Sequence, residues 1–219
     1  MIRGFSRRRF MTVSAAVTGV ATLDVAGTLR PAAAADRAGD WSGGHSENGW
    51  PVLDTAQSFD IEGSDQKVPL AGADAAAALT HVARRFHYEI DSLRDGDVHG
   101  WTKDHAVTQA YESNHLSGSA IAVRPLCYPA GSRGNLYPNE LVVVRDILAE
   151  LDGVVAWGGD FKTPKESHFE IATTPGHPKL KGVARKIRRW NSGPGSEGAG
   201  ATDAFNPERR SAARSLRTG

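Results

Sequence analysis

The chain has 219 residues, of which 40% are hydrophobic and 23% are charged, and this composition excludes a multi-span membrane protein and a fully disordered chain. Its single cysteine, Cys127, excludes an intrachain disulfide and a cysteine-based zinc cage. Residues 1–35 contain five arginines and one aspartate, so the rest of the chain carries a net charge of −3 rather than the basic surplus typical of a nucleic-acid-binding protein.

The first 35 residues resemble a twin-arginine export signal. Residues 6–11 read Ser-Arg-Arg-Arg-Phe-Met, a weakly apolar stretch follows over residues 11–29, and four alanines at 32–35 suit a signal peptidase. Asp24 interrupts the apolar stretch, and a charged residue at the centre of a membrane span costs about 3 kcal/mol. We therefore expect an exported protein with no stable membrane span once the signal is removed. The alternative is a basic arm that happens to precede alanines.

The chain beyond the signal divides into a linker, a folded domain and a tail. Residues 36–51 are polar and rich in glycine, which predicts a linker whose Trp41 and Trp50 are able to pack back on the domain. Residues 191–219 contain glycines followed by scattered arginines without an apolar period, which predicts a disordered tail. The folded domain is expected over residues 52–190.

Three segments of this domain have helical patterns. Residues 73–87 are rich in alanine, a strong helix former. Residues 138–151 begin with a proline, which suits a first helical turn, and Gly153 follows as a stop. Residues 179–189 form a basic run whose apolar positions recur at helical spacing. The residues that supply the three apolar faces are Leu79, Val82, Ala83, Phe86, Leu141, Val144, Ile147, Leu148, Leu151, Leu180, Val183 and Ile187.

Three short segments are typical of β-strands, at residues 120–124, 154–157 and 168–172. They alternate irregularly with the helical segments, and long loops are expected over residues 124–138 and 157–167. This arrangement favours an α+β fold over a regular alternation of strands and helices.

Two of the eight histidines stand at the junction of a loop and a predicted strand. His115 lies in the sequence Ser-Asn-His-Leu-Ser-Gly-Ser-Ala-Ile-Ala of residues 113–122, and His168 follows a loop that begins with Trp-Gly-Gly-Asp at residues 157–160. A strand can aim such a side chain while the loop leaves room for a ligand. Each histidine alone is better explained as an ordinary polar residue, but the pair indicates a shared site.

The two segments together resemble the VanY-like D-alanyl-D-alanine carboxypeptidases, zinc peptidases of bacterial cell-wall metabolism. The first signature of that family is Ser-x-His-x-x-Gly-x-Ala-x-Asp, and the second is a Trp-Gly-Gly-Asp stretch that leads to His-Phe-Glu. The resemblance extends over about residues 80–187 and implies a hedgehog/D,D-peptidase-like fold, with a small antiparallel sheet flanked by helices. The residues that match the signatures are Ser113, His115, Gly118, Ala120, Trp157, Gly158, Gly159, Asp160, His168, Phe169 and Glu170.

The resemblance also implies a site and a reaction. His115 and His168 are expected to bind zinc, and Glu166 is expected to act as the catalytic base. Zinc held by three protein ligands lowers the pKa of a bound water toward about 7, and a nearby carboxylate takes its proton while the hydroxide attacks the peptide carbonyl. The substrate would be a peptidoglycan stem peptide, with Ser113, Trp157 and Asp160 expected to bind it. The protein would be extracellular or associated with the cell wall, and we expect a monomer.

The sequence departs from the family pattern at two positions. Ala122 stands where the signature places its zinc-binding aspartate, and alanine cannot bind a metal. Lys165 stands three residues before His168, where the family places its base, and Glu166 lies one residue later. A lysine close to zinc weakens cation binding by repulsion. Glu170 shares a strand face with His168 and is the candidate replacement ligand, although it is also suited to a hydrogen bond with a neighbouring group.

Three hypotheses therefore stay open at this point. The first is an exported zinc metallopeptidase of the D-alanyl-D-alanine carboxypeptidase type. The second is a catalytically inactive module that binds cell-wall peptides and has lost the third zinc ligand. The third is a structural protein in which the signature glycines serve turn geometry alone.

Overall fold

A computed structural model describes residues 39–193 and 202–218 of the chain. The chain divides into two units, Met1–Arg37 and Ala38–Gly219, and all described residues belong to the second unit. The predicted export signal over residues 1–35 lies outside the described residues. None of the helices in the described part of the chain is both long and apolar enough to cross a membrane.

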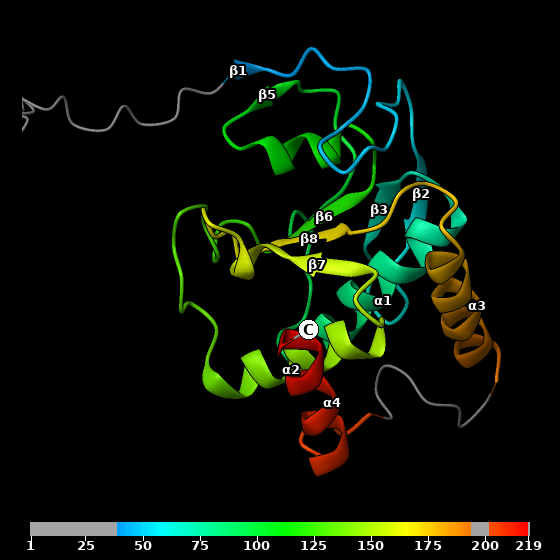
Figure 1. The fold of residues 1–219 in the computed structure, drawn as a ribbon, viewed down its shortest axis with the longest axis vertical. Helices are drawn as coiled ribbons and strands as arrows, with labels where there is room; N and C mark the ends of the chain where they lie inside the picture. Colours follow the sequence, from blue (N-terminus) through cyan, green and yellow to red (C-terminus); the bar gives the residue numbers. More distant parts are fainter. Residues whose placement is uncertain (1–38, 194–201, 219) are drawn as a thin grey trace, which may run out of the picture. The chain divides into compact units, whose positions relative to one another are not determined.

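The structure confirms an α+β fold with small antiparallel sheets. The largest sheet has four strands in the order β4-β6-β8-β7, and every neighbouring pair in it is antiparallel (Figure 1). The three strands predicted from the sequence are confirmed within two residues. The strands of this sheet are β4 (Val98–His99), β6 (Ala120–Val123), β7 (Val155–Trp157) and β8 (His168–Ile171).

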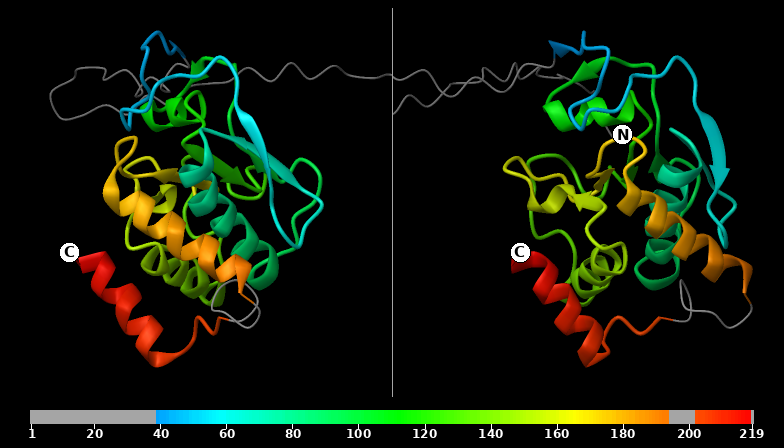
Figure 2. Two further views of the ribbon diagram at one scale, coloured as in Figure 1. Left: turned by 90° about the vertical axis from the view of Figure 1, so that its right-hand side faces the viewer. Right: turned by 45° about the vertical axis from the view of Figure 1, so that its right-hand side comes forward.

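Three helices pack beside this sheet and form the core with it. They are α1 (Ala73–Glu89), α2 (Pro138–Glu150) and α3 (Pro178–Ser192), each close to its predicted position. Helix α1 contacts β6, β8 and both other helices, and α3 runs alongside it (Figure 2). The alanine side chains of α1 are small, so neighbouring elements can pack close to the backbone of this helix. The largest fully buried side chains of the core include Leu79, Ile121, Ile147, Phe169, Ile171 and Ile187.

The described domain also contains two smaller sheets and two short 3-10 helices. Strand β1 (Gly39–Asp40) pairs with β5 (Ala106–Val107), and β2 (Gln57–Asp60) pairs with β3 (Lys67–Leu70). The 3-10 helices are η1 (Ala110–His115) and η2 (Gly158–Asp160).

The predicted linker is attached to the domain more closely than its composition suggests. Besides β1, it contains Trp50, which is buried in the core and donates a hydrogen bond from Nε1 to the backbone oxygen of Thr173 at 2.7 Å. Ser46 is buried as well, and its hydroxyl contacts that of Ser117 at 2.9 Å. These contacts join residues 39–51 to segments far along the chain, so local composition does not reveal them.

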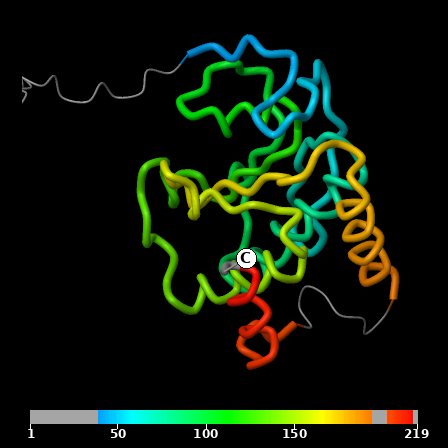
Figure 3. The backbone as a smooth tube through the Cα atoms, in the orientation of Figure 1, coloured from blue at the N-terminus to red at the C-terminus, as the bar shows by residue number. Residues whose placement is uncertain are grey.

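The predicted disordered tail also differs from the structure. Helix α3 continues to Ser192, and a further helix, α4 (Pro207–Thr218), packs against α2 (Figure 3). The sequence of α4 is strongly charged, and the helix forms ion pairs with α2. Arg209 donates to Asp146 at 2.7 and 2.8 Å and to Glu150 at 3.0 Å.

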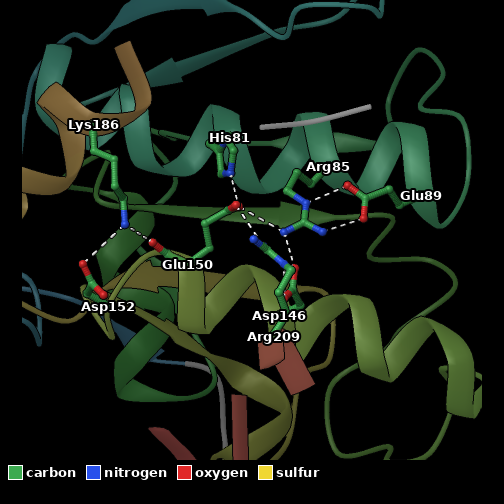
Figure 4. A network of polar contacts seen from close by, with 8 residues as sticks. All are labelled: His81, Arg85, Glu89, Asp146, Glu150, Asp152, Lys186 and Arg209. Atoms are coloured by element: carbon green, nitrogen blue, oxygen red, sulfur yellow. Dashed lines mark hydrogen bonds and ion pairs between the residues drawn. The ribbon is translucent and has the colours of Figure 1, made fainter. Parts of the chain in front are cut away.

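Arg209 is part of a buried polar network between α1, α2 and α4 (Figure 4). Arg85, fully buried on α1, donates to Asp146 at 2.6 Å, to Glu150 at 3.0 Å and to Glu89 at 2.5 and 2.6 Å. His81 contacts Glu150 at 2.7 Å. Each of the three carboxylates thus has at least one arginine partner, and buried charges require such pairing. We call these residues the α1–α2 network.

Candidate functional site

The two signature histidines meet at neighbouring strands of the central sheet. His115 is the last residue of η1, shortly before β6, and His168 is the first residue of β8. Strands β6 and β8 pair so that Ala122 lies opposite His168. The ring centroids of His115 and His168 lie 5.2 Å apart, with an angle of 71° between the ring planes. Segments far apart in sequence therefore converge on one place.

Two signature glycines allow this convergence. Gly118 has φ +65°, and a Cβ added there would lie 2.7 Å from the backbone nitrogen of Ala71. A Cβ added at Gly158 would lie 2.4 Å from the backbone oxygen of Lys165 and 2.9 Å from the Cβ of His168. Real Cβ atoms do not approach so closely, so both turns require glycine. The turns in which they lie then set the backbone positions of the two histidines.

Each histidine donates one ring N–H to a fixed oxygen. His115 Nδ1 donates to the backbone oxygen of Gly100 at 2.9 Å. Glu170 Oε2 accepts an N–H from Asn114 at 2.7 Å and lies 2.7 Å from His168 Nε2, which donates to it when the carboxylate is ionised. The lone pair of His115 is consequently on Nε2, and with Glu170 ionised that of His168 is on Nδ1. His168 Nδ1 is buried and has no hydrogen-bond partner among the described residues.

Both imidazoles are neutral near pH 7. Burial, together with the proximity of His168 and Lys165, lowers the pKa of His115 to about 3. Burial and the charge of Lys165 lower the pKa of His168 to about 3. Burial raises the pKa of Glu170 to about 7, although the hydrogen bond from Asn114 opposes this shift. The positive charge in this region is therefore carried by Lys165.

The described side chains match only part of the zinc site that the resemblance implies. With zinc–nitrogen bonds of about 2.1 Å, two rings that bind one tetrahedral ion would have centroids roughly 5 Å apart, as His115 and His168 do. The third position is the methyl group of Ala122. Glu170 lies on the Nε2 side of the His168 ring and orients that ring instead. Within the residues that the structure describes, no three His, Cys, Asp or Glu side chains are grouped to hold a metal. The three-ligand zinc centre does not fit this donor set.

Glu166, the predicted base, is a buried loop-stabilising residue. Its carboxylate accepts hydrogen bonds from the backbone N–H groups of Gly134 and Asn135 at 2.8 and 2.9 Å, and from Asn135 Nδ2 at 2.8 Å. Its backbone oxygen accepts a hydrogen bond from Trp157 Nε1 at 2.7 Å. Among its described contacts, none of those made by the carboxylate reaches His115 or His168. These bonds hold the loop before α2 instead.

Lys165 occupies a cleft beside His115 and Ala122. Its ammonium contacts Glu112 Oε1 at 2.7 Å, and both side chains are 17% exposed. The cleft has a volume of about 390 Å³, within the usual range for small-ligand sites. Its lining residues are His99, Gly100, Thr102, Asp104, Ala106, Thr108, Glu112, His115, Ala122, Pro125 and Lys165.

The three residues predicted to bind substrate do not line this cleft. Ser113 is buried, and its hydroxyl donates to the backbone oxygen of Ala110 at 2.6 Å. Trp157 is buried beneath the guanidinium of Arg145, which lies 4.8 Å from the ring centroid. Asp160 pairs with the same arginine at 2.6 Å. The structure thus brings the two histidines together but gives these three residues other contacts.

Sequence reasoning missed two features that surround His168. Asn114 orients Glu170, and its only sequence signal is its place next to His115. The rings of Tyr111 and Phe161 pack against His168, with centroids 5.0 and 5.9 Å away. Each of these aromatic residues lies close to a signature segment in the sequence. That position is the one sequence signal by which it could have been predicted.

Comparisons with known proteins return no match for this chain. No family model matches it, and no curated protein and no solved structure is similar to it at a significant level. The resemblance therefore rests on the two signature segments, and the function drawn from it is a proposal.

Proposed function

We propose that this protein binds the stem peptides of peptidoglycan without hydrolysing them, using a hedgehog/D,D-peptidase-like domain. One observation carries the proposal: Ala122 and Lys165 both line the cleft beside the two histidines. In the family that the chain resembles, these two positions hold the third zinc ligand and the base. The histidines and glycines that shape the family's site are retained. The groups required for hydrolysis are replaced.

The chemistry of amide hydrolysis supports this interpretation. A metallopeptidase needs a bound cation to activate water and a carboxylate to accept its proton. Here a fixed ammonium lies in the cleft, and it repels a divalent ion. The predicted base, Glu166, is held by three hydrogen bonds to the loop before α2. The carboxylate of Glu112, which lies in the cleft with His115, is paired with Lys165. Binding of a peptide requires neither a metal nor a base.

The N-terminal sequence is consistent with a partner outside the cell membrane. The twin-arginine pattern of residues 6–11 and the alanines at 32–35 predict export, and peptidoglycan lies on that side of the membrane. We propose that the exported protein is extracellular or associated with the cell wall.

Binding and hydrolysis can be measured on the same purified, exported form of the chain. We expect it to sediment with purified peptidoglycan and to bind diacetyl-L-Lys-D-Ala-D-Ala in calorimetry, without releasing D-alanine. Ala106→Trp, which fills the cleft, should abolish peptide binding. Ala130→Trp, at an exposed loop position, is the matched control. The proposal would be contradicted if the unaltered protein bound neither peptidoglycan nor the peptide, or if it released D-alanine.

A residual zinc peptidase is the second candidate, and the orientation of the imidazoles favours it. Each ring has one nitrogen fixed by an oxygen acceptor and a lone pair on the other, the arrangement that metal-binding histidines require. Metal analysis of protein purified without a histidine tag separates the two candidates. We expect zinc well below one ion per chain, rising in Ala122→Asp but not in Ala122→Asn. One zinc per unaltered chain together with D-alanine release would establish the second candidate instead.

A further inference from the structure

The Lys165 ammonium is a fixed cation inside the cleft. The backbone of Lys165 is anchored on both sides, because its N–H donates to the oxygen of Gly158 at 3.0 Å and its oxygen accepts from His168 N–H at 2.9 Å. The close packing at Gly158 holds this turn in place. The side chain is therefore presented from a rigid segment, and little further ordering is needed when it binds a ligand.

The ammonium can bind a second anionic group in addition to Glu112. An ammonium group has three N–H donors, and the structure gives Lys165 one side-chain partner among the described residues. Glu112 does not depend on this lysine alone, because its Oε2 accepts backbone N–H groups from Thr108 and Gln109 at 2.8 and 3.2 Å. A ligand carboxylate can thus share the ammonium without leaving Glu112 unpaired.

The other groups in the cleft complement such a ligand. His115 lines the same cleft and carries a lone pair on Nε2, which can accept an N–H from a peptide. Asp104 is the second carboxylate in the lining, but it is exposed and accepts the backbone N–H of Ala106 at 3.0 Å. Solvent screens its charge more than that of the half-buried Lys165.

We propose that Lys165 binds the terminal carboxylate of the peptide, so that the cleft selects peptides with a free C-terminus. This inference rests on the proposed function and names the ligand group that the cleft recognises. In a zinc peptidase the same position would hold a carboxylate that accepts a proton. In this chain it holds a cation that recognises an anion.

The direct test compares diacetyl-L-Lys-D-Ala-D-Ala with its C-terminal carboxamide by calorimetry. Loss of a charge-assisted hydrogen bond typically reduces affinity by about tenfold or more, so the acid should bind at least about tenfold more tightly than the amide. Lys165→Met should bring the two affinities together. Lys162→Met, which removes an exposed lysine from the same loop, should leave the ratio unchanged. Thermal unfolding of each variant checks that the fold is retained.

A second variant gives the opposite result and cannot be explained by unfolding. Glu112→Gln keeps an acceptor for the two backbone N–H groups but removes the competing charge, so acid-peptide affinity should rise severalfold. Equal affinity for the acid and the amide in the unaltered protein would overturn this inference and leave the proposed function standing. An unchanged or weaker affinity in Glu112→Gln would also overturn it. If neither peptide nor peptidoglycan binds, the proposed function itself fails.

Discussion

Two buried polar clusters of this domain each contain histidine, but they differ in how their charges are balanced. In the α1–α2 network, Arg85 and Arg209 bond directly to carboxylates from α1 and α2, and His81 contacts Glu150. Near β6 and β8, two neutral imidazoles lie beside a cleft with the half-buried pair of Lys165 and Glu112.

The comparison shows what distinguishes a structural cluster from a candidate site. A buried ring nitrogen without a partner is not sufficient, because His81 Nδ1 and His168 Nδ1 both lack one among the described residues. The histidine of the network packs against the ring of Trp190, with centroids 6.1 Å apart. The histidine pair instead adjoins a cleft that contains Lys165, whose ammonium has one side-chain partner among the described residues. The cleft and its ammonium, rather than the histidines, indicate ligand binding.

The largest expected effect tests whether the α1–α2 network is structural. Arg85→Met leaves Asp146 with Arg209 and Glu150 with Arg209 and His81, and removal of one partner from a buried ion pair costs about 3–5 kcal/mol. Urea unfolding should show this loss in the free energy of unfolding. Lys67→Met, which breaks the exposed pair with Asp60, is the control and should lower the free energy of unfolding far less. Equal losses in the two variants would mean that the network contributes no more than a surface pair.

A smaller loss of stability is expected when Glu166 is replaced. This variant tests whether Glu166 stabilises the loop before α2 rather than acting in the cleft. Glu166→Ala leaves the N–H groups of Gly134 and Asn135 without their acceptor, and such a loss costs about 1–3 kcal/mol. Thermal and urea unfolding measure the change, with Asp160→Ala as a control at an exposed ion pair. A variant as stable as the unaltered protein would show that Glu166 does not stabilise the loop. Glu166 would then again be a candidate catalytic residue.

The smallest difference between variants is expected at His81, within a gradual loss of stability in acid that comes from the network. Burial lowers the pKa of His81, so the unfolded chain binds its proton first and stability falls as the pH drops below about 6.5. Burial opposes ionisation of Glu150, but the hydrogen bond with His81 and the charge of Arg85 outweigh it and lower its pKa to about 2. Its contribution is complete above the usual carboxyl pKa of about 4.3 and is lost as the pH falls toward 2.

Unfolding measured between pH 7 and pH 3 tests this dependence. His81→Gln keeps an N–H donor for Glu150 but does not titrate, so stability should fall less steeply below pH 6.5. His45→Gln, at an exposed position, should follow the unaltered protein. The same slope in all three proteins would exclude His81 as a source of the acid sensitivity.

Local sequence was sufficient for the main elements and for the histidine pair. Helices α1 and α2 and strands β6 and β8 were predictable because apolar period, proline and glycine act over a few residues. Ala122 and Lys165 could also be recognised from the sequence as departures from the family pattern, because each position is defined by its spacing from a nearby histidine.

Only the tertiary structure decided how the remaining groups are used. Glu166 accepts hydrogen bonds from a loop about thirty residues earlier in the chain, and Arg209 joins α4 to carboxylates on α2. Trp50 joins the predicted linker to the core in the same way. Hydrogen bonds between distant segments leave no period in the sequence, because their partners are selected by folding. The sequence by itself therefore determined which residue types stand near the two histidines, and the fold determined which of them face the cleft.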